Sequence, residues 1–237
     1  MTIERVKTGI PGLDELIEGG FPRGRTILIS GTCGTGKSTF GVQYIYNGIT
    51  QYNENGILVV LEENPKELKE EMLRFNFDLQ KQEDENKLRI ISTDLRGGLS
   101  LEELSDIIPA RAKEINARRA VIDSLSAIDF LIEKRGEERH IMHDLIVSIS
   151  KMVKELNLTT LLMTEIPEGS ELISQRGIES HIADGVIILK IHEAIDARKM
   201  TIRKMRGTKH SVKPVDIELT ERGFVVKPEI ESKKPIF

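Results

Sequence analysis

Short runs of apolar and β-branched residues alternate along the chain with longer segments in which apolar residues recur every three or four positions. Within the runs, apolar residues do not alternate with polar ones, which is typical of strands buried on both faces of a sheet. The expected strands are Thr26–Ser30, Ile57–Leu61, Leu88–Ile91, Ala120–Ile122, Thr160–Met163 and Val186–Ile191. With helices between them, they predict an α/β fold with a mostly parallel central sheet flanked by helices.

Helices are expected between these strands. The segments Pro65–Phe75, Leu101–Ala117 and Glu137–Leu156 have the helical period, and Thr39–Ile45 continues a strand as a helix. Asn64 is a suitable N-cap ahead of Pro65, because its side chain can accept a hydrogen bond from the first turn and proline is tolerated there.

The pattern changes after Ile191. Lys199–Met205, Val215–Leu219 and Phe224–Val226 are short and separated by turn residues, so they are expected to extend the sheet as a C-terminal β-hairpin extension. We interpret residues 1–227 as a single domain and residues 228–237 as a flexible tail.

Composition narrows the class of protein. The 237 residues are 39% hydrophobic and 30% charged, which is enough apolar surface for a core. No apolar run approaches the ~18 residues of a membrane span, and the first residues do not resemble a signal peptide. The single cysteine, Cys33, excludes a disulfide scaffold. We therefore expect a soluble, cytoplasmic protein that does not interact with a membrane. The aromatic content is only 4% and tryptophan is absent, which argues against a surface that binds nucleic acid by base stacking.

Charge is distributed unevenly. The chain has a net charge of -4, but the segment from Arg198 to the end contains 11 Lys and Arg against 5 Asp and Glu. The preceding residues carry 23 basic against 33 acidic side chains. The basic C-terminal segment is therefore suited to bind anions, including anions that the acidic preceding part of the protein binds.

The strongest chemical signal is a complete GxxxxGK[ST] motif between an expected strand and an expected helix. Glycines let successive backbone N–H groups turn toward phosphate oxygens, and the helix N-terminus adds its positive end. Lys37 is expected to bridge the β- and γ-phosphates and Ser38 to offer its hydroxyl to Mg2+. The expected nucleotide-binding residues here are Gly31, Thr32, Cys33, Gly34, Thr35, Gly36, Lys37, Ser38 and Thr39.

Two other strand ends supply carboxylates. Asp123 closes a buried strand, where an aspartate can hold the water shell of Mg2+. Glu62 and Glu63 follow another strand and point to opposite faces, so one can act as the base for the attacking water while the other orients it. Which of the two is the base stays open, and Glu62 is also a candidate Mg2+ ligand beside Ser38 and Asp123.

Together these motifs resemble the KaiC-type ATPases of the RecA superfamily, from about Thr8 to about Val226. The resemblance is carried by Gly9–Gly24, the phosphate loop, Glu62–Glu63, Asp123–Leu125, Met163–Glu165, Ser174–Leu189 and Lys204–Thr208 with His210. It implies a Mg2+-dependent ATPase that forms a homohexamer and whose tandem glutamates serve the hydrolytic water. It also implies that a basic segment reaches the ATP of the neighbouring subunit, through Lys204, Met205, Arg206, Thr208 and His210, with Lys204 and Arg206 taking part in catalysis.

Three alternatives stay open beside a regulatory ATPase. The phosphorylated half of the circadian-clock ATPase of this family carries a Ser-Thr pair where only Ser180 has a hydroxyl here, so weak or absent autokinase activity is expected. A DNA motor of the RadA or DnaB kind is disfavoured, because Glu165–Ala183 holds four glutamates against one arginine and would repel phosphates. A nucleotide-gated scaffold with little turnover is the third.

Overall fold

The computed structural model describes residues 3–61, 63–92, 101–127, 140–167 and 178–227. Its helices are α1 (Lys37–Tyr52), α2 (Pro65–Leu73), α3 (Leu79–Asp84), α4 (Leu101–Glu114), α6 (His140–Glu155) and α7 (Ile178–Ile182), with 3-10 turns η1 (Asp14–Ile17) and η3 (Glu193–Ile195). None of the helices in these ranges is both long and apolar enough to cross a membrane.

Strands form one large sheet and a small separate pair. The pair is β1 (Arg5–Val6) and β2 (Phe21–Pro22). The large sheet contains β3 (Thr26–Gly31), β4 (Gly56–Val60), β5 (Leu88–Ser92), β6 (Arg119–Asp123), β7 (Thr159–Glu165), β8 (Gly185–His192), β9 (Ala197–Met205), β10 (Val215–Thr220) and β11 (Gly223–Lys227). Its order is β11-β10-β9-β8-β3-β7-β6-β4-β5, with β8 to β5 mutually parallel and β9, β10 and β11 antiparallel. The predicted α/β class and the C-terminal β-hairpin extension are both confirmed.

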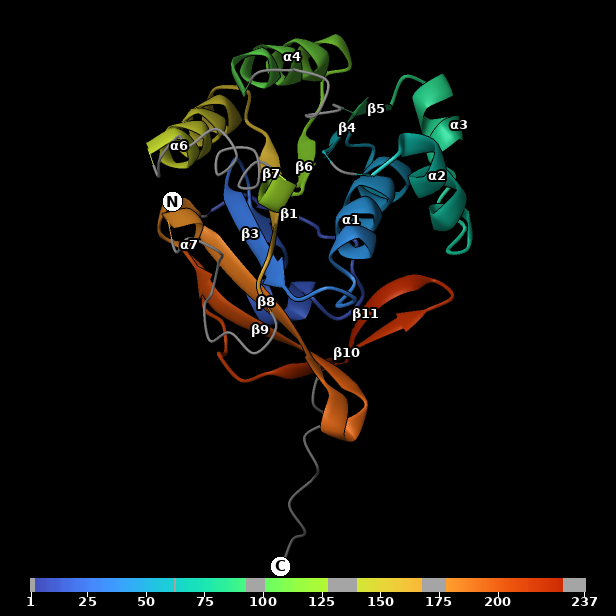
Figure 1. Ribbon diagram of the computed structural model, residues 1–237, viewed down its shortest axis with the longest axis vertical. Helices are drawn as coiled ribbons and strands as arrows, with labels where there is room; N and C mark the ends of the chain where they lie inside the picture. Colours follow the sequence, from blue (N-terminus) through green and yellow to red (C-terminus); the bar gives the residue numbers. More distant parts are fainter. Residues whose placement is uncertain (1–2, 62, 93–100, 128–139, 168–177, 228–237) are drawn as a thin grey trace, which may run out of the picture.

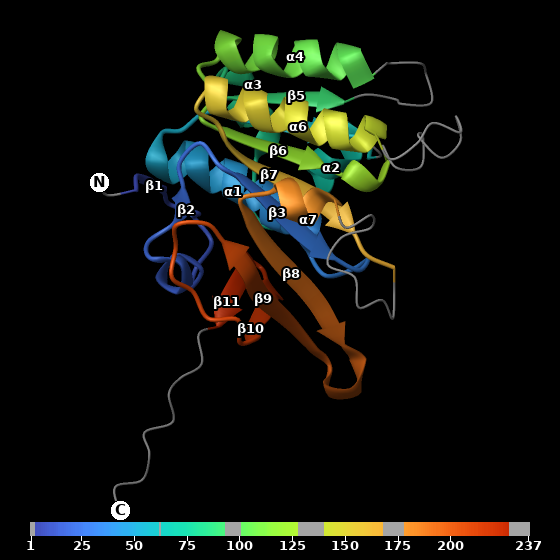
Figure 2. The ribbon, with the colours of Figure 1, turned by 90° about the vertical axis from the view of Figure 1, so that its left-hand side faces the viewer.

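The parallel strands are buried on both faces. In β3, Ile27 and Ile29 pack into the core under α1, whereas Leu28 between them packs into the core under α4 and α6. Figures 1 and 2 show α1, α2 and α3 on one side of the sheet and α4 and α6 on the other. Because successive strand side chains point to opposite faces, both faces need apolar residues, and this explains the unbroken apolar runs.

Several helices end in the same way. An asparagine with positive φ follows α1, α2, α3, α4 and α6, at Asn53, Asn76, Asn86, Asn116 and Asn157. Asparagine tolerates the left-handed conformation that turns the chain out of a helix. It explains why α4 ends at Glu114, before the Ala117 that the apolar period predicts. The expected cap of α2 is confirmed, since the Asn64 side chain accepts a hydrogen bond from Lys66 N at 2.9 Å.

The C-terminal strands are tied to α1. Gln43 donates from its side-chain amide to Phe224 O at 3.0 Å and accepts from Phe224 N at 2.6 Å. Phe40 and Phe224 also meet edge to face, with ring centroids 5.1 Å apart. Helix α1, which starts at the phosphate loop, is therefore packed between the parallel strands and β11.

Candidate functional site: a phosphate loop at the carboxyl edge of the sheet

The carboxyl ends of four parallel strands bring the chemically important residues to one edge of the sheet. Gly31 at the end of β3 pairs with Glu165 at the end of β7. Val60 at the end of β4 pairs with Asp123 at the end of β6, and Leu61 N donates to Asp123 O at 2.8 Å. Open α/β sheets place ligands beyond this edge, so these ends define the candidate site.

The loop from Gly31 to Gly36 joins β3 directly to α1, as the motif predicts. Gly34 and Gly36 have φ values of 73° and 91°, which favour glycine. The first helical hydrogen bond runs from Phe40 N to Gly36 O at 2.9 Å. Inside the loop, the buried Thr35 hydroxyl donates to Thr32 O at 2.8 Å and fixes its curvature. This geometry leaves backbone N–H groups at a helix N-terminus, which suits an anion.

Lys37 lies over this loop. Its Nζ donates to Gly31 O at 2.9 Å and to Thr32 O at 2.8 Å. Burial lowers the pKa of the Lys37 ammonium below its ordinary value, although the nearby charges of Glu165 and Asp123 oppose that shift. The lysine is therefore held at the loop as a partly desolvated cation.

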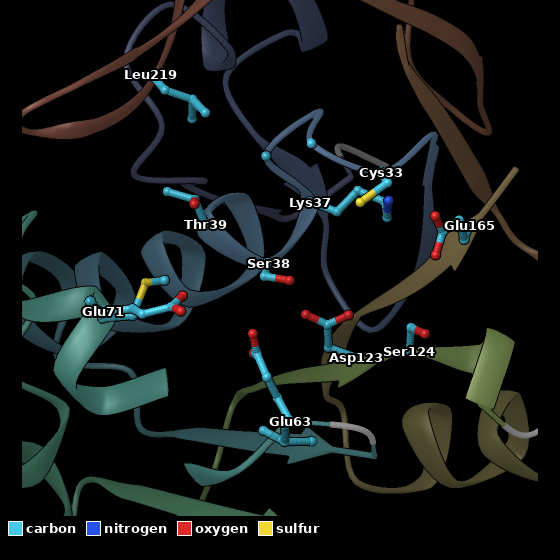
Figure 3. Close-up of a pocket in the computed structure, with 14 residues that line it drawn as sticks. Cys33, Lys37, Ser38, Thr39, Glu63, Glu71, Asp123, Ser124, Glu165 and Leu219 are labelled. Carbon is cyan, nitrogen blue, oxygen red and sulfur yellow. The ribbon is translucent and has the colours of Figure 1, made fainter. Parts of the chain in front are cut away.

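A cavity of about 580 Å³ opens beside the loop. Figure 3 shows Ser38, Glu63 and Asp123 pointing toward the same space, with Lys37 and Cys33 above it and Glu165 to one side. The cavity is lined by Cys33, Gly34, Gly36, Lys37, Ser38, Thr39, Val60, Glu63, Glu71, Met72, Asp123, Ser124, Glu165 and Leu219. Four carboxylates line this cavity (Glu63, Glu71, Asp123 and Glu165), against the single ammonium of Lys37. Because a polyphosphate is also negatively charged, it would enter the cavity only together with a cation.

The donor set fits Mg2+ better than a metal held wholly by protein. Within the described ranges, no group of three or more His, Cys, Asp or Glu side chains is placed to hold a metal ion. Ser38 and Asp123 both face the cavity (Figure 3). Mg2+ keeps several waters and binds through one or two protein oxygens plus phosphate oxygens, which is the arrangement these two side chains allow.

The strand carrying the tandem glutamates reaches the site indirectly. Strands β7 and β6 separate β4 from β3, so β4 is not the neighbour of the loop strand. Helix α1 crosses the sheet and contacts both β6 and β4, and this brings the loop and Glu63 to one cavity. Glu62 lies outside the described residues, so only Glu63 can be placed.

The basic segment lies at the other end of β3. Met205 at the end of β9 pairs with Gly185 at the start of β8, and Gly185 pairs with Ile27 near the start of β3. The Met205 side chain is buried, so only its backbone is available to a ligand. Nearby, the Thr208 hydroxyl accepts from Arg5 Nη1 at 2.9 Å, and His210 Nδ1 lies 3.0 Å from Thr208 O.

Lys204 and Arg206 leave one face of this segment, as their spacing predicts. Lys204 Nζ donates to Ser180 O, His181 O and Ala183 O at 3.1, 3.3 and 2.6 Å. Arg206 Nη1 pairs with Asp184 Oδ1 at 3.4 Å. The structure therefore brings the phosphate loop, Glu63 and Asp123 together, and it does not bring Lys204, Met205, Arg206, Thr208 or His210 to them within one chain.

Some cavity residues were missed by reasoning from sequence. Glu71, to which the sequence motifs give no role, reaches the cavity from α2, and Leu219 reaches it from β10. Helix α2 follows the tandem glutamates directly, which is the only local signal for Glu71. Leu219 has no local signal, because its position depends on how β10 returns to α1. The acidic stretch that disfavours DNA binding is described only in part, because two of its four glutamates, Glu168 and Glu171, lie outside the described ranges.

Comparisons with known proteins show the family of this chain. Residues 6–231 match the family described as ATPase: KaiC. The chain is 35% identical to a UPF0273 protein of Methanocaldococcus jannaschii, covering 96% of this chain and 98% of that protein. It is 32% identical to the circadian clock oscillator protein KaiC of Synechococcus elongatus, covering 95% of this chain but 44% of the relative. The crystal structure of a KaiC-like protein from Pyrococcus horikoshii superposes with a TM-score of 0.85 at 41% identity, covering 96% of this chain and all of that one.

Proposed function

Because this chain belongs to the KaiC family of ATPases, we propose that it binds Mg-ATP at the phosphate loop and hydrolyses it at sites completed by neighbouring subunits. The observation that carries the proposal is the division of the predicted catalytic residues between the two ends of β3. Lys37, Asp123 and Glu63 gather at the carboxyl end. Lys204 and Arg206 lie at the amino end.

At the carboxyl end, each side chain has a distinct task. Lys37 neutralises phosphate charge at the loop, and Ser38 with Asp123 would hold Mg2+ directly or through its waters. When bound, Mg2+ supplies positive charge against the β- and γ-phosphate oxygens. Glu63, or Glu62 beside it, accepts a proton from the attacking water.

The separation within one chain supports a contribution from a neighbouring subunit. Residues Thr26 to Gly31 span β3, which corresponds to roughly 15–20 Å along the strand. Side chains at its amino end therefore do not reach phosphates at its carboxyl end. The basic C-terminal segment and the acidic remainder of the chain favour head-to-tail contact, which closes into a ring. A homohexamer is the ring that we propose.

A complementation experiment tests the shared site. Lys37→Ala and Arg206→Ala chains should each be nearly inactive, since one lacks the phosphate contact and the other the charge delivered to the γ-phosphoryl group, worth on the order of 1000-fold. Mixed oligomers should regain phosphate release, because an intact Arg206 then meets an intact Lys37. Arg203→Ala, which removes an exposed arginine of the same strand, is the matched control and should stay active. Failure to recover in oligomers shown by native mass spectrometry to be mixed would refute the proposal.

Autophosphorylation is expected to be weak or absent in the same preparations. Ser180 lies in α7, and it is the only hydroxyl at the position where the phosphorylated half of KaiC carries a Ser-Thr pair. Phosphopeptide mapping after incubation with ATP measures the occupancy of Ser180. High occupancy would contradict hydrolysis as the main activity.

A further inference from the structure

Asp184 is a buried carboxylate at the junction of α7 and β8, and its side chain is only 8% exposed. Its backbone joins the sheet on both sides, because Asp184 N donates to Thr26 O at 2.8 Å and Asp184 O accepts from Arg206 N at 2.9 Å. The side chain is thereby fixed between the start of β3 and the end of β9.

Two guanidinium groups share one oxygen of this carboxylate. Asp184 Oδ1 lies 3.2 Å from Arg25 Nη1 and 3.4 Å from Arg206 Nη1. The second oxygen, Oδ2, accepts from Thr26 N at 3.4 Å. The Arg25 and Arg206 side chains are 44% and 56% exposed, so both remain accessible to solvent while they pair with Asp184.

Lys204 is held beside them by different groups. Its Nζ donates to three carbonyl oxygens at the end of α7, where the helix dipole favours a cation. Burial and the nearby Arg206 lower the pKa of Lys204, and the negative charge of Asp184 opposes the shift. Three cations and one carboxylate therefore form a single cluster with a net positive charge.

We propose that Asp184 is a positioning residue for the shared site, and that it presents Arg25 together with Arg206 to the phosphates of a neighbouring subunit. The inference rests on the proposed function. A free arginine side chain has many rotamers, and a charged hydrogen bond that restricts it reduces the entropy lost when it meets a phosphate. Arg25 directly precedes β3 and is a cation at this edge for which the sequence motifs gave no role.

Asp184→Asn is the informative variant. It keeps the size of the side chain and an oxygen for Thr26 N, while it removes the charge shared by the two guanidiniums. Because charged hydrogen bonds are stronger than neutral ones and the arginines are half exposed, we expect turnover to fall on the order of ten-fold at saturating ATP. Nucleotide affinity should change little, since the phosphate loop is at the other end of β3. Asp216→Asn, an exposed aspartate paired with Lys199 on the same sheet extension, is the matched control.

Mixing experiments separate positioning from a general structural defect. Asp184→Asn chains should recover when mixed with Lys37→Ala chains, which supply an intact basic edge to an intact phosphate loop. They should not recover with Arg206→Ala chains, because every interface then has an impaired edge. Damage confined to the variant's own fold would give no recovery with either partner, and that result would overturn the inference.

Arg25→Gln provides a second route should Asp184→Asn fail to fold, since the Arg25 side chain is about half exposed. This variant should show reduced turnover, which should recover on mixing with Lys37→Ala chains and not with Arg206→Ala chains. Wild-type turnover in Arg25→Gln would overturn the proposal that Asp184 presents both arginines to the phosphates. The two proposals fail separately. Loss of recovery between Arg206→Ala and Lys37→Ala refutes the shared site, whereas recovery there with fully active Asp184→Asn refutes only the role of Asp184.

Discussion

The buried ion pair between Arg119 and Glu54 gives the sharpest stability prediction. Arg119 begins β6, the strand that ends at Asp123, and its side chain is completely buried. Its Nε and Nη2 donate to Glu54 Oε2 at 2.8 and 2.7 Å, and its other donors reach Tyr44 O and Lys7 O at 2.9 and 2.8 Å. The guanidinium therefore ties α1, the N-terminal segment and β6 together.

Glu54→Gln removes the negative charge and leaves this cation buried. It also removes the charge that faces Arg23 Nη2 at 2.8 Å, although Arg23 keeps its pair with Glu4. Removing one partner of a buried pair costs about 3–5 kcal/mol. Glu54 is 15% exposed, and the rings of Tyr44 and Tyr52 lie 4.6 and 5.4 Å from the Arg119 guanidinium carbon. Because both features moderate the loss, we expect the lower end, about 3 kcal/mol, which for a chain of this size lowers the melting temperature by roughly 6–12 °C.

Thermal unfolding by circular dichroism, without nucleotide, measures this effect, since a ligand would stabilise the folded state. Glu85→Gln makes the same charge change in an exposed pair with Lys87 and should leave the melting temperature unchanged. Adding Arg119→Met to Glu54→Gln should restore part of the stability, because the fully buried cation is then gone and Arg23, the other partner of Glu54, still pairs with Glu4. A Glu54→Gln variant that melts with the wild type, or a double variant less stable than the single one, would refute the reasoning.

Three further expectations can be measured with the same preparations. Gly48→Ala should lower the melting temperature despite the helix preference for alanine, since its Cβ would lie 2.4 Å from two Arg119 side-chain atoms; a stabilised variant would contradict the packing. Replacing Glu62 and Glu63 by glutamine should keep ATP binding but reduce turnover by roughly 100-fold, and unchanged phosphate release would place the base elsewhere. ATP affinity should weaken as pH rises, and the loss should begin below the pH at which an ordinary lysine loses its proton, because burial lowers the pKa of Lys37; calorimetry on wild type and Lys37→Ala distinguishes this from a general alkaline effect.

What the sequence predicts well is local. The parallel strands are recognised because both faces of each must be apolar, and the phosphate loop because its glycines and lysine follow one another along the chain. The apolar period does not predict helix α3, because this helix is too short to show the period. Its N-cap is nevertheless visible in the sequence, since the Asp78 side chain accepts a hydrogen bond from Lys81 N. The asparagines that end the helices were a visible signal that the apolar period alone does not use.

What the sequence does not predict depends on contacts between distant segments. The order of strands places β7 and β6 between β3 and β4, and no run of residues reveals this. Leu219 lines the cavity only because the C-terminal strands return to α1. Asp184 likewise pairs with Arg25, which lies 159 positions earlier in the chain, and with Arg206, which lies 22 positions later.

Strand β3 carries the phosphate loop at one end and the Arg25–Asp184 cluster near the other, and under the proposed shared site this has a consequence for gene dosage. The number of complete catalytic centres equals the number of subunit contacts: a lone chain has none, an open row has one fewer than its subunits, and a closed ring has one for each. Specific activity should therefore rise with protein concentration until rings close. A chain defective at both ends of β3 would silence two centres wherever it is incorporated, so a modest amount of it would act as a dominant inhibitor.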